Sequence, residues 1–332
     1  MAKGAVNRLA FSRVAETSFA TAQITPADMV SQAFQGDPPV ADYTYEDDKD
    51  YVSGLMGNME QAQVTQFVDG AVTYRLQPYM IGVLLGFAVG QNWTSVAGIA
   101  PNAASYTATM TAGSLTTDMP STTLQLINAR GNFQLPGCKI KSLEIIGEAG
   151  KLWTVKVEWR GSGVTAASTM VWTTVTNNRE CLFGWNQAAI KIAGVDHSPK
   201  MRKFSLKIEN KFQDTDYGAD SLTATELEVV DRLISGTFEM KEDPTYTTVI
   251  DAITALTDET LEFVLTGPII PSCSTAAYSI DITLPRCKFT QPKTSGGKGI
   301  QMHQVKFDGL INPGTSTDIG PISVVNAQAA LQ

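Results

Sequence analysis

An internal repeat constrains the fold of this chain more than any other sequence feature. Residues 135–139 read LPGCK and residues 284–288 read LPRCK, so leucine, proline, cysteine and lysine return in the same order. Each motif is followed by a turn and a strand-like run, VKVEW at 155–159 and VKFDG at 305–309. The spacing from motif to run differs by one residue, as a single insertion in the turn would cause.

A second pair of anchors points to the same duplication. Gly70 and Pro78 lie eight residues apart, and so do Gly236 and Pro244. In both places a short alternating run separates the two residues and an apolar run follows. Anchors that recur in one order predict an internal repeat, and a unit this long is expected to be a domain rather than one turn of a solenoid.

The length of the chain agrees with two domains. A chain of 332 residues is long enough for two units of roughly 150 residues, each able to bury its own core. We place the first domain at residues 1–165, with an N-terminal arm and a long loop. The second domain, with a C-terminal arm, is placed at residues 166–332.

Hydropathy patterns predict mostly strands in both copies. In residues 151–160 apolar side chains alternate with polar ones, and residues 203–212 repeat this pattern. Such alternation is typical of half-buried strands. One short helix is expected in each copy, at residues 79–87 and after Asp243-Pro244, where a capping carboxylate precedes a proline.

The expected fold class is therefore mainly β. We predict two tandem β-sandwich or barrel domains, each with one short helix, and an arm at either end of the chain. A short helix near residues 27–33 is expected in the N-terminal arm. A final strand at residues 322–325 is expected in the C-terminal arm.

The net charge of the chain argues against one class of function. The formal net charge is −8 at pH 7, from 33 acidic and 25 basic residues. This argues against a general nucleic-acid binder, because such proteins carry basic surfaces that displace counterions from phosphates. The N-terminus lacks the apolar segment of a secretory signal, and no apolar run reaches the roughly 18 residues of a membrane span.

Cysteine, histidine and glycine patterns do not indicate catalysis. Four cysteines in a chain this long are not a disulfide scaffold, and Cys138 and Cys287 are predicted to be small core residues. His303 is expected to be partly buried in a strand, and no histidine or cysteine spacing matches a structural zinc site. Residues 294–299 lack the spacing of a phosphate-binding loop, so a hairpin loop is favoured. No residue is assigned to catalysis, cofactor binding or metal binding.

An acidic cluster precedes a glycine-containing stretch. Asp47, Asp48 and Asp50 lie in the segment DYTYEDDKD. The cluster lacks the glycine and the distal glutamate of an EF-hand loop, so a cation site is not favoured. A solvated or partner-facing acidic loop is expected here.

Several weak segments occur together in a characteristic order. They are ETSFATA at 16–22, DYTYEDDKD at 42–50, residues 135–161, KFSLKIENKFQ at 203–213, RLISGTFEM at 232–240 and QMHQVKFDGL at 301–310. In this order the chain resembles the tail tube, or major tail, proteins of long-tailed bacteriophages, in their two-domain form. The resemblance spans nearly the whole chain, although no single motif is diagnostic.

The resemblance implies a structural, non-enzymatic protein of the virion tail, assembled in the bacterial host and without a cofactor. Such proteins form rings around a hollow lumen, and the rings stack into a tube through which DNA passes without specific binding. A duplicated chain implies three subunits in a pseudo-six-fold ring. The implied partners are further copies of the chain and the tape measure, tail terminator and distal tail proteins.

The resemblance also suggests where copies meet. Heterologous contacts close into rings or extend into filaments, and exposed strand edges pair across copies. The two arms and the loop at 46–61, which contains Asp47, Asp48 and Asp50, are candidates for contacts between rings. An acidic lumen would let DNA slide, because repulsion removes the sites at which basic side chains would hold a polyanion.

A second hypothesis is a soluble β-sandwich binding module, for example a carbohydrate-binding virion protein. It requires an exposed aromatic platform, for which Trp93, Trp172 and Trp185 are candidates. Assembly distinguishes the two hypotheses, because a tube protein polymerises whereas a binding module stays a small oligomer.

Overall fold

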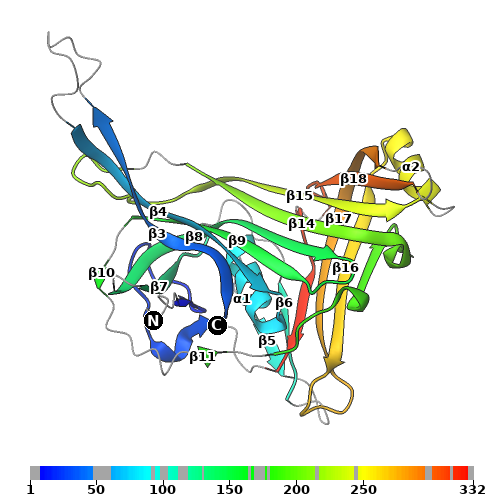
Figure 1. The fold of residues 1–332 in the computed structure, drawn as a ribbon, viewed down its shortest axis with the longest axis horizontal. Helices are drawn as coiled ribbons and strands as arrows, with labels where there is room; N and C mark the ends of the chain where they lie inside the picture. Colours follow the sequence, from blue (N-terminus) through cyan, green and yellow to red (C-terminus); the bar gives the residue numbers. More distant parts are fainter. Residues whose placement is uncertain are drawn as a thin grey trace, which may run out of the picture.

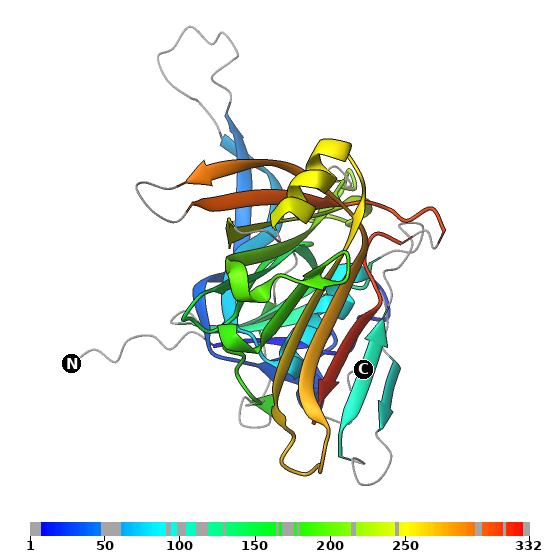
Figure 2. The same cartoon turned by 90° about the vertical axis from the view of Figure 1, so that its right-hand side faces the viewer.

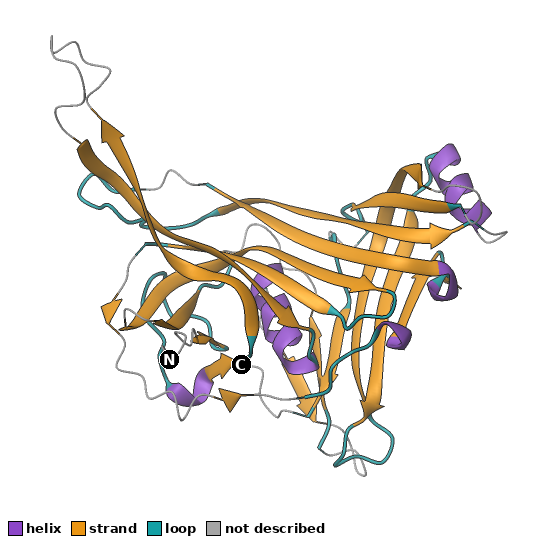
Figure 3. Cartoon of the chain, viewed as in Figure 1, coloured by secondary structure: helices purple, strands orange, loops and turns teal. Residues whose placement is uncertain are grey.

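The fold is mainly β, as the sequence predicts. The computed structural model describes residues 8–47, 61–90, 94–97, 104–110, 119–128, 131–163, 166–167, 176–177, 180–213, 217–242, 246–295, 301–314 and 317–327. These residues form nineteen strands and two α-helices (Figures 1 and 3). None of the helices in these segments is long and apolar enough to cross a membrane.

The strands of the N-terminal half are short except for three long ones. They are β1 (Arg8–Ser12), β2 (Met29–Ser31), β3 (Phe34–Asp47), β4 (Gln61–Arg75), β5 (Thr94–Ala97), β6 (Tyr106–Met110), β7 (Thr122–Asn128), β8 (Gly131–Glu148), β9 (Thr154–Gly161) and β10 (Ala166–Ala167).

The C-terminal half contains the remaining strands. They are β11 (Thr176–Asn177), β12 (Ala188–Ile192), β13 (Val195–Asp196), β14 (Met201–Phe212), β15 (Val229–Lys241), β16 (Glu259–Ile269), β17 (Ala277–Ser295), β18 (Met302–Gly309) and β19 (Ile322–Asn326). The helices are α1 (Pro78–Val89) and α2 (Tyr246–Ala255), so each half carries one short helix, as expected.

Two antiparallel units with the same strand order form the centre of the sheet. In the first, the order is β3–β4–β9–β8, and in the second it is β14–β15–β18–β17. In each unit a helix follows the second strand, α1 after β4 and α2 after β15. The units are joined directly, because residues 142–148 of β8 pair with residues 203–209 of β14.

The strand register places the two anchor glycines at equivalent positions, but it changes the alignment of the strand-like runs that follow the two motifs. Gly70 and Gly236 take the same ladder position, opposite the aromatic residues Trp159 and Phe307. Counted from the LPGCK and LPRCK motifs, however, residues 157–161 (VEWRG) match residues 305–309 (VKFDG). The sequence alignment of VKVEW with VKFDG was therefore wrong by two residues, and the duplication itself stays a prediction.

The two anchor glycines are required by close packing across strands. A Cβ atom at Gly70 would lie 2.5 Å from the Cα atom of Pro39. At Gly236 it would lie 2.2 Å from the ring of Phe307 and 2.2 Å from the backbone oxygen of Ser205. Only a residue without a side chain fits at either position.

Helix α1 is a core helix because its sequence is apolar on every side. All of its residues are buried. It begins with Pro78, whose missing N–H costs nothing in the first turn, and Gly90 ends it in the left-handed conformation. The helix packs against β8 and β19, so elements from both halves of the chain cover it.

The arms are strands rather than helices. The expected helix near residues 27–33 is wrong: Pro26–Asp28 form a single 3-10 turn, and β2 follows and pairs with β1. Met29 and Val30 are buried there, so packing overrides the local preference. The predicted C-terminal strand is confirmed as β19, which lies between β17 and β6 (Figure 2).

Candidate assembly interface

The first feature relevant to assembly is a pair of strand segments that are hydrogen-bonded to a neighbouring strand along one edge only. Among the described strands, β3 has a paired neighbour on one side, β4. Residues 288–295 of β17 likewise pair only with β18. In β8, the matching strand of the first unit, the corresponding residues pair with β14 on their second side. A strand edge without a partner is a template for pairing with another chain.

The open edges differ in charge. Within β3, Asp42 and Glu46 are exposed. The sequence of β17 places Lys288 and Lys293 in its open segment. Both strands also contain prolines beside register irregularities, which limit indiscriminate pairing. The two edges are thus complementary in charge rather than alike.

The second feature is the polar face shared by the two units. Along β9, β14 and β18, buried apolar residues alternate with more exposed polar ones, so one face packs on the core and the other is polar. We call this second surface the polar face. Its described residues include Thr73, Ser142, Glu144, Lys156, Glu158, Lys207, Glu209, Ser235, Lys306 and Asp308.

Charges on the polar face compensate one another. Glu144 lies between Lys156 and Lys207 in the strand register. Lys156 donates to Glu158 at 2.6 Å, and Lys207 donates to Glu209 at 2.5 Å. The hydrogen bond from Lys156 lowers the pKa of Glu158, and the same contact raises the pKa of Lys156. Both members of this pair therefore stay charged at neutral pH.

The acidic cluster predicted to mediate contacts is only partly within the described residues. Asp47 is the last residue of β3 and pairs with Gln61 of β4. Asp48 and Asp50 lie outside the described residues. The exposed segment before them contains Tyr43 and Tyr45, whose rings lie 6.4 Å apart. The role of the cluster stays a prediction.

Other sequence predictions about single residues are confirmed. Cys138 and Cys287 are fully buried, and burial raises the pKa of both thiols, to about 12 for Cys287. His303 is buried in β18 with its Nε2 atom 3.3 Å from Glu242.

Sequence reasoning missed two partly buried carboxylates that hold the arms in place. Glu16 accepts hydrogen bonds from the Ser121 and Thr123 hydroxyls and from the backbone N–H of Gly137, at 2.6 to 2.9 Å. Glu180 accepts from the backbone N–H groups of Tyr79 and Ala327, at 2.7 and 3.1 Å. An isolated glutamate in a sequence reads as a surface residue, so no pattern identified either one.

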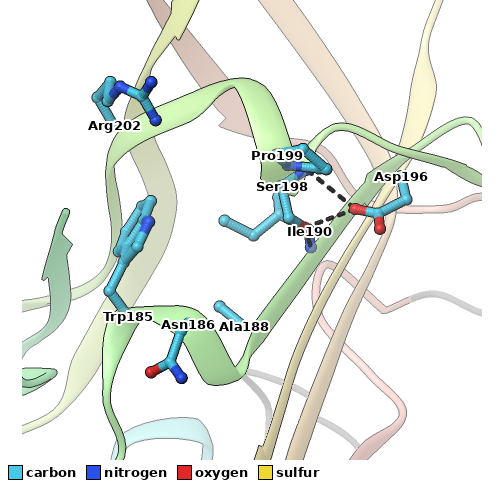
Figure 4. A pocket seen from close by; sticks show the side chains of 8 residues that line it. All are labelled: Trp185, Asn186, Ala188, Ile190, Asp196, Ser198, Pro199 and Arg202. Atoms are coloured by element: carbon cyan, nitrogen blue, oxygen red, sulfur yellow. Dashed lines mark hydrogen bonds between the residues drawn. The ribbon is translucent and has the colours of Figure 1, made fainter. Parts of the chain in front are cut away.

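Trp185 lies between two cavities at one end of the sheet. It is half-buried and stacks on the core residue Trp153, with ring centroids 5.2 Å apart. A cavity of about 350 Å³ on one side is lined by Trp185, Asn186, Ala188, Ile190, Asp196, Ser198, Pro199 and Arg202 (Figure 4). A second cavity, of about 390 Å³, is lined by residues 150–152 and 184–186.

Comparison with known proteins decides between the two functional hypotheses. The family model described as phage tail tube protein matches residues 6–309. The chain belongs to the phage tail tube protein family. No curated protein matches it.

A tail tube protein is a structural component of the virion tail, and it assembles with itself and with other tail proteins. The β-rich fold agrees with this assignment. The family match argues against the carbohydrate-binding hypothesis. Of its candidate tryptophans, Trp93 and Trp172 lie outside the described residues, and Trp185 is partly covered by Trp153.

Proposed function

We propose that three copies of this tail tube protein close into a ring and that the rings stack into a hollow tube. The equal strand order of the two units supports this proposal, because three copies would present six similar units around one axis. The division of the chain into domains at residues 1–165 and 166–332 belongs to the same proposal.

The joint between copies would reproduce the joint inside the chain. Within one copy, β14 pairs with β8. Between copies, β3 would pair with β17, since these strands hold the matching positions in the two units. The internal register carried over to this joint places Asp42 opposite Thr290 and Val40 opposite Lys293. The opposite charges of the two edges favour this pairing over β3–β3 or β17–β17 contacts.

The polar face would line the channel. The opposite face of the sheet is covered by the core and by α1, so closure of the sheet into a barrel leaves the polar face inside. There Lys156 and Lys207 each lie next to a carboxylate, so DNA would meet no uncompensated basic site at these positions to hold it. DNA would pass without specific binding because of paired charges, rather than because of an acidic lumen.

Disulfide cross-linking tests the joint between copies. We would combine D42C and T290C in one chain and analyse the oxidised protein on a non-reducing gel. The expected product is a covalent series that ends at three 35.7-kDa chains. The matched control pairs D42C with T237C, since Thr237 lies in the middle of the sheet, where another copy has no access to its backbone.

Electron microscopy of the unmodified protein supplies the number of copies. End-on views with three- or six-fold features are expected. A closed series of another number of chains, or equal cross-linking of the control pair, would contradict the three-copy ring joined through β3 and β17.

A further inference from the structure

The backbone of β3 presents a hydrogen-bond donor to its open edge at Tyr43. Tyr43 lies opposite Gln66 of β4, and the Gln66 N–H donates to the Leu222 carbonyl at 2.7 Å instead of to β3. Opposite residues in an antiparallel pair either exchange both hydrogen bonds or exchange none. The N–H and C=O groups of Tyr43 therefore point away from β4, toward the open edge. Pro38 and Pro39, earlier in the strand, have no N–H group to offer.

The side chain of Asp42 occupies this donor. Its Oδ1 atom accepts a hydrogen bond from the Tyr43 N–H at 2.9 Å. Both residues are exposed, so an approaching strand can reach them. The capped N–H cannot pair with another strand until the carboxylate leaves, and the negative charge repels a second acidic edge. Charged side chains are a common protection of edge strands against unwanted pairing.

On β17 the group that faces the open edge is the backbone of Phe289. The Leu310 N–H donates to the Arg286 carbonyl at 2.8 Å, so residue 286 faces β18. Backbone groups point to alternate sides along a strand, so Phe289, three residues further on, faces away from β18. Its side chain is buried, which holds this part of the strand in place.

The joint proposed between copies brings these two backbone groups together. Thr290 lies opposite Asp42 in that joint. The next pair along consists of Tyr43 and Phe289, which both face their open edges. One pair further, Lys288 lies diagonally from Asp42 on the same face of the sheet. Diagonal neighbours at this spacing are within reach of a long side chain, so the lysine and the carboxylate can form an ion pair.

The joint inside the chain shows the matching carboxylate already paired. Glu209 of β14 takes the ladder position in the second unit that Asp42 takes in the first. It lies opposite Ser142 of β8, within the formed joint. Its carboxylate accepts a hydrogen bond from Lys207 at 2.5 Å. A lysine therefore neutralises the carboxylate at this position where two units are joined.

We propose that Asp42 is a removable guard on the open edge of β3. In a free chain its carboxylate caps the Tyr43 N–H. In the joint, Lys288 of the next copy binds the carboxylate, and the Phe289 carbonyl accepts from the released N–H. A second β3 cannot make this exchange, because it brings another carboxylate instead of a lysine. Asp42 thus selects β17 as the partner of β3, an inference that rests on the proposed joint between these strands.

Amide exchange tests the cap in single chains, at a protein concentration below that of assembly. The Tyr43 N–H of the wild type should exchange severalfold more slowly than that of D42A, and tyrosine-selective isotope labelling lets NMR read it. D42N keeps an acceptor oxygen without the charge and should retain most of the protection. D251A, on the exposed side of α2, is the control for a charge lost elsewhere. Equal exchange in wild type and D42A, or in D42N and D42A, would overturn the cap.

Sedimentation at assembling concentrations tests the choice of partner. D42A should form dimers through two β3 edges beside its rings, severalfold more than the wild type or D251A. K288A should slow ring formation about tenfold in the wild type and much less in D42A, where no cap has to be released. The absence of such dimers, or an equal effect of K288A in both backgrounds, would overturn the selection of β17 by Asp42.

The two measurements separate this inference from the proposed ring. A protected Tyr43 amide, together with a K288A effect that depends on Asp42, would support the guard even in assemblies of another number of copies. Such assemblies would contradict only the three-copy ring. Three-copy rings in a protein whose Tyr43 amide exchanges equally fast with and without Asp42 would support the ring and contradict the guard.

Discussion

Arg232 and Asp318 form a two-pronged ion pair at the end of α1. The Nε atom and one terminal nitrogen of Arg232 each donate to a carboxylate oxygen of Asp318 at 2.8 Å. The other terminal nitrogen donates to the carbonyl of Val89, the last residue of the helix, at 3.0 Å. One guanidinium therefore joins a helix of the first half, a strand of the second and the C-terminal segment.

Breaking this pair is expected to destabilise the whole protein. The two side chains are only 6% and 10% exposed, so R232A or D318A leaves a buried charge without its partner. Loss of about 3 to 5 kcal/mol of unfolding free energy is expected, measured by chemical denaturation. The double variant R232M/D318L should lose much less. K151A, at an exposed pair with Glu148, is the control and should lose far less stability.

Glu16 is expected to fix the N-terminal segment to the LPGCK strand. E16A removes the acceptor of the Ser121, Thr123 and Gly137 hydrogen bonds and leaves these donors in a partly buried site. A loss of about 2 to 3 kcal/mol is expected, since hydrogen bonds to a charged group are the stronger kind. E16Q keeps an acceptor oxygen and should lose less. Equal stability of E16A and wild type in thermal unfolding would contradict the assignment.

Glu180 is expected to make stability depend on pH. Burial raises its pKa above the ordinary value, despite the hydrogen bonds from Tyr79 and Ala327. The folded state then holds this proton more tightly than the unfolded state, so stability falls as pH rises from 4.5 through the raised pKa. E180Q should be more stable than wild type at neutral pH, and the difference should shrink at acidic pH. A difference that grows on acidification would reverse the predicted sign.

Charge compensation on the polar face is expected to keep DNA mobile. E144K would place three lysines side by side in one cross-strand row, at positions 144, 156 and 207. Assembled E144K tubes should retain duplex DNA at low salt, and this retention should weaken steeply as salt rises. Filter binding measures it, with D251K on α2 as the control of equal net charge. Equal retention by the two variants would place the polar face away from the channel.

Local pattern was enough to predict individual elements. The alternating runs correctly predicted β9 and β14, and the apolar run after Pro78 correctly predicted α1. Burial of Cys138 and Cys287 followed from residue type alone. The short run at 27–33 was misread because Met29 and Val30 are ordered by contacts with distant strands rather than by local preference.

The neighbouring strand with which each strand pairs could not be predicted from local sequence patterns. Alternation shows which face of a strand is buried, but it does not show which strand lies beside it. The β8–β14 joint and the pairing of β19 with β6 connect residues far apart in sequence. The Arg232–Asp318 pair depends on those pairings, because its members meet only after the two halves are joined. The role of the acidic loop in contacts between rings remains a prediction from sequence.

The β8–β14 joint has a consequence for the thermodynamics of assembly. Each free body that joins a ring loses translational and rotational entropy, which opposes association. In a ring of three copies, half of the joints between units would already be formed within a chain, at a fixed effective concentration. Only three separate chains, rather than six separate units, would lose translational and rotational entropy when a ring forms. A covalently joined pair of units should therefore close its rings at lower protein concentration than separate units of the same edge strength.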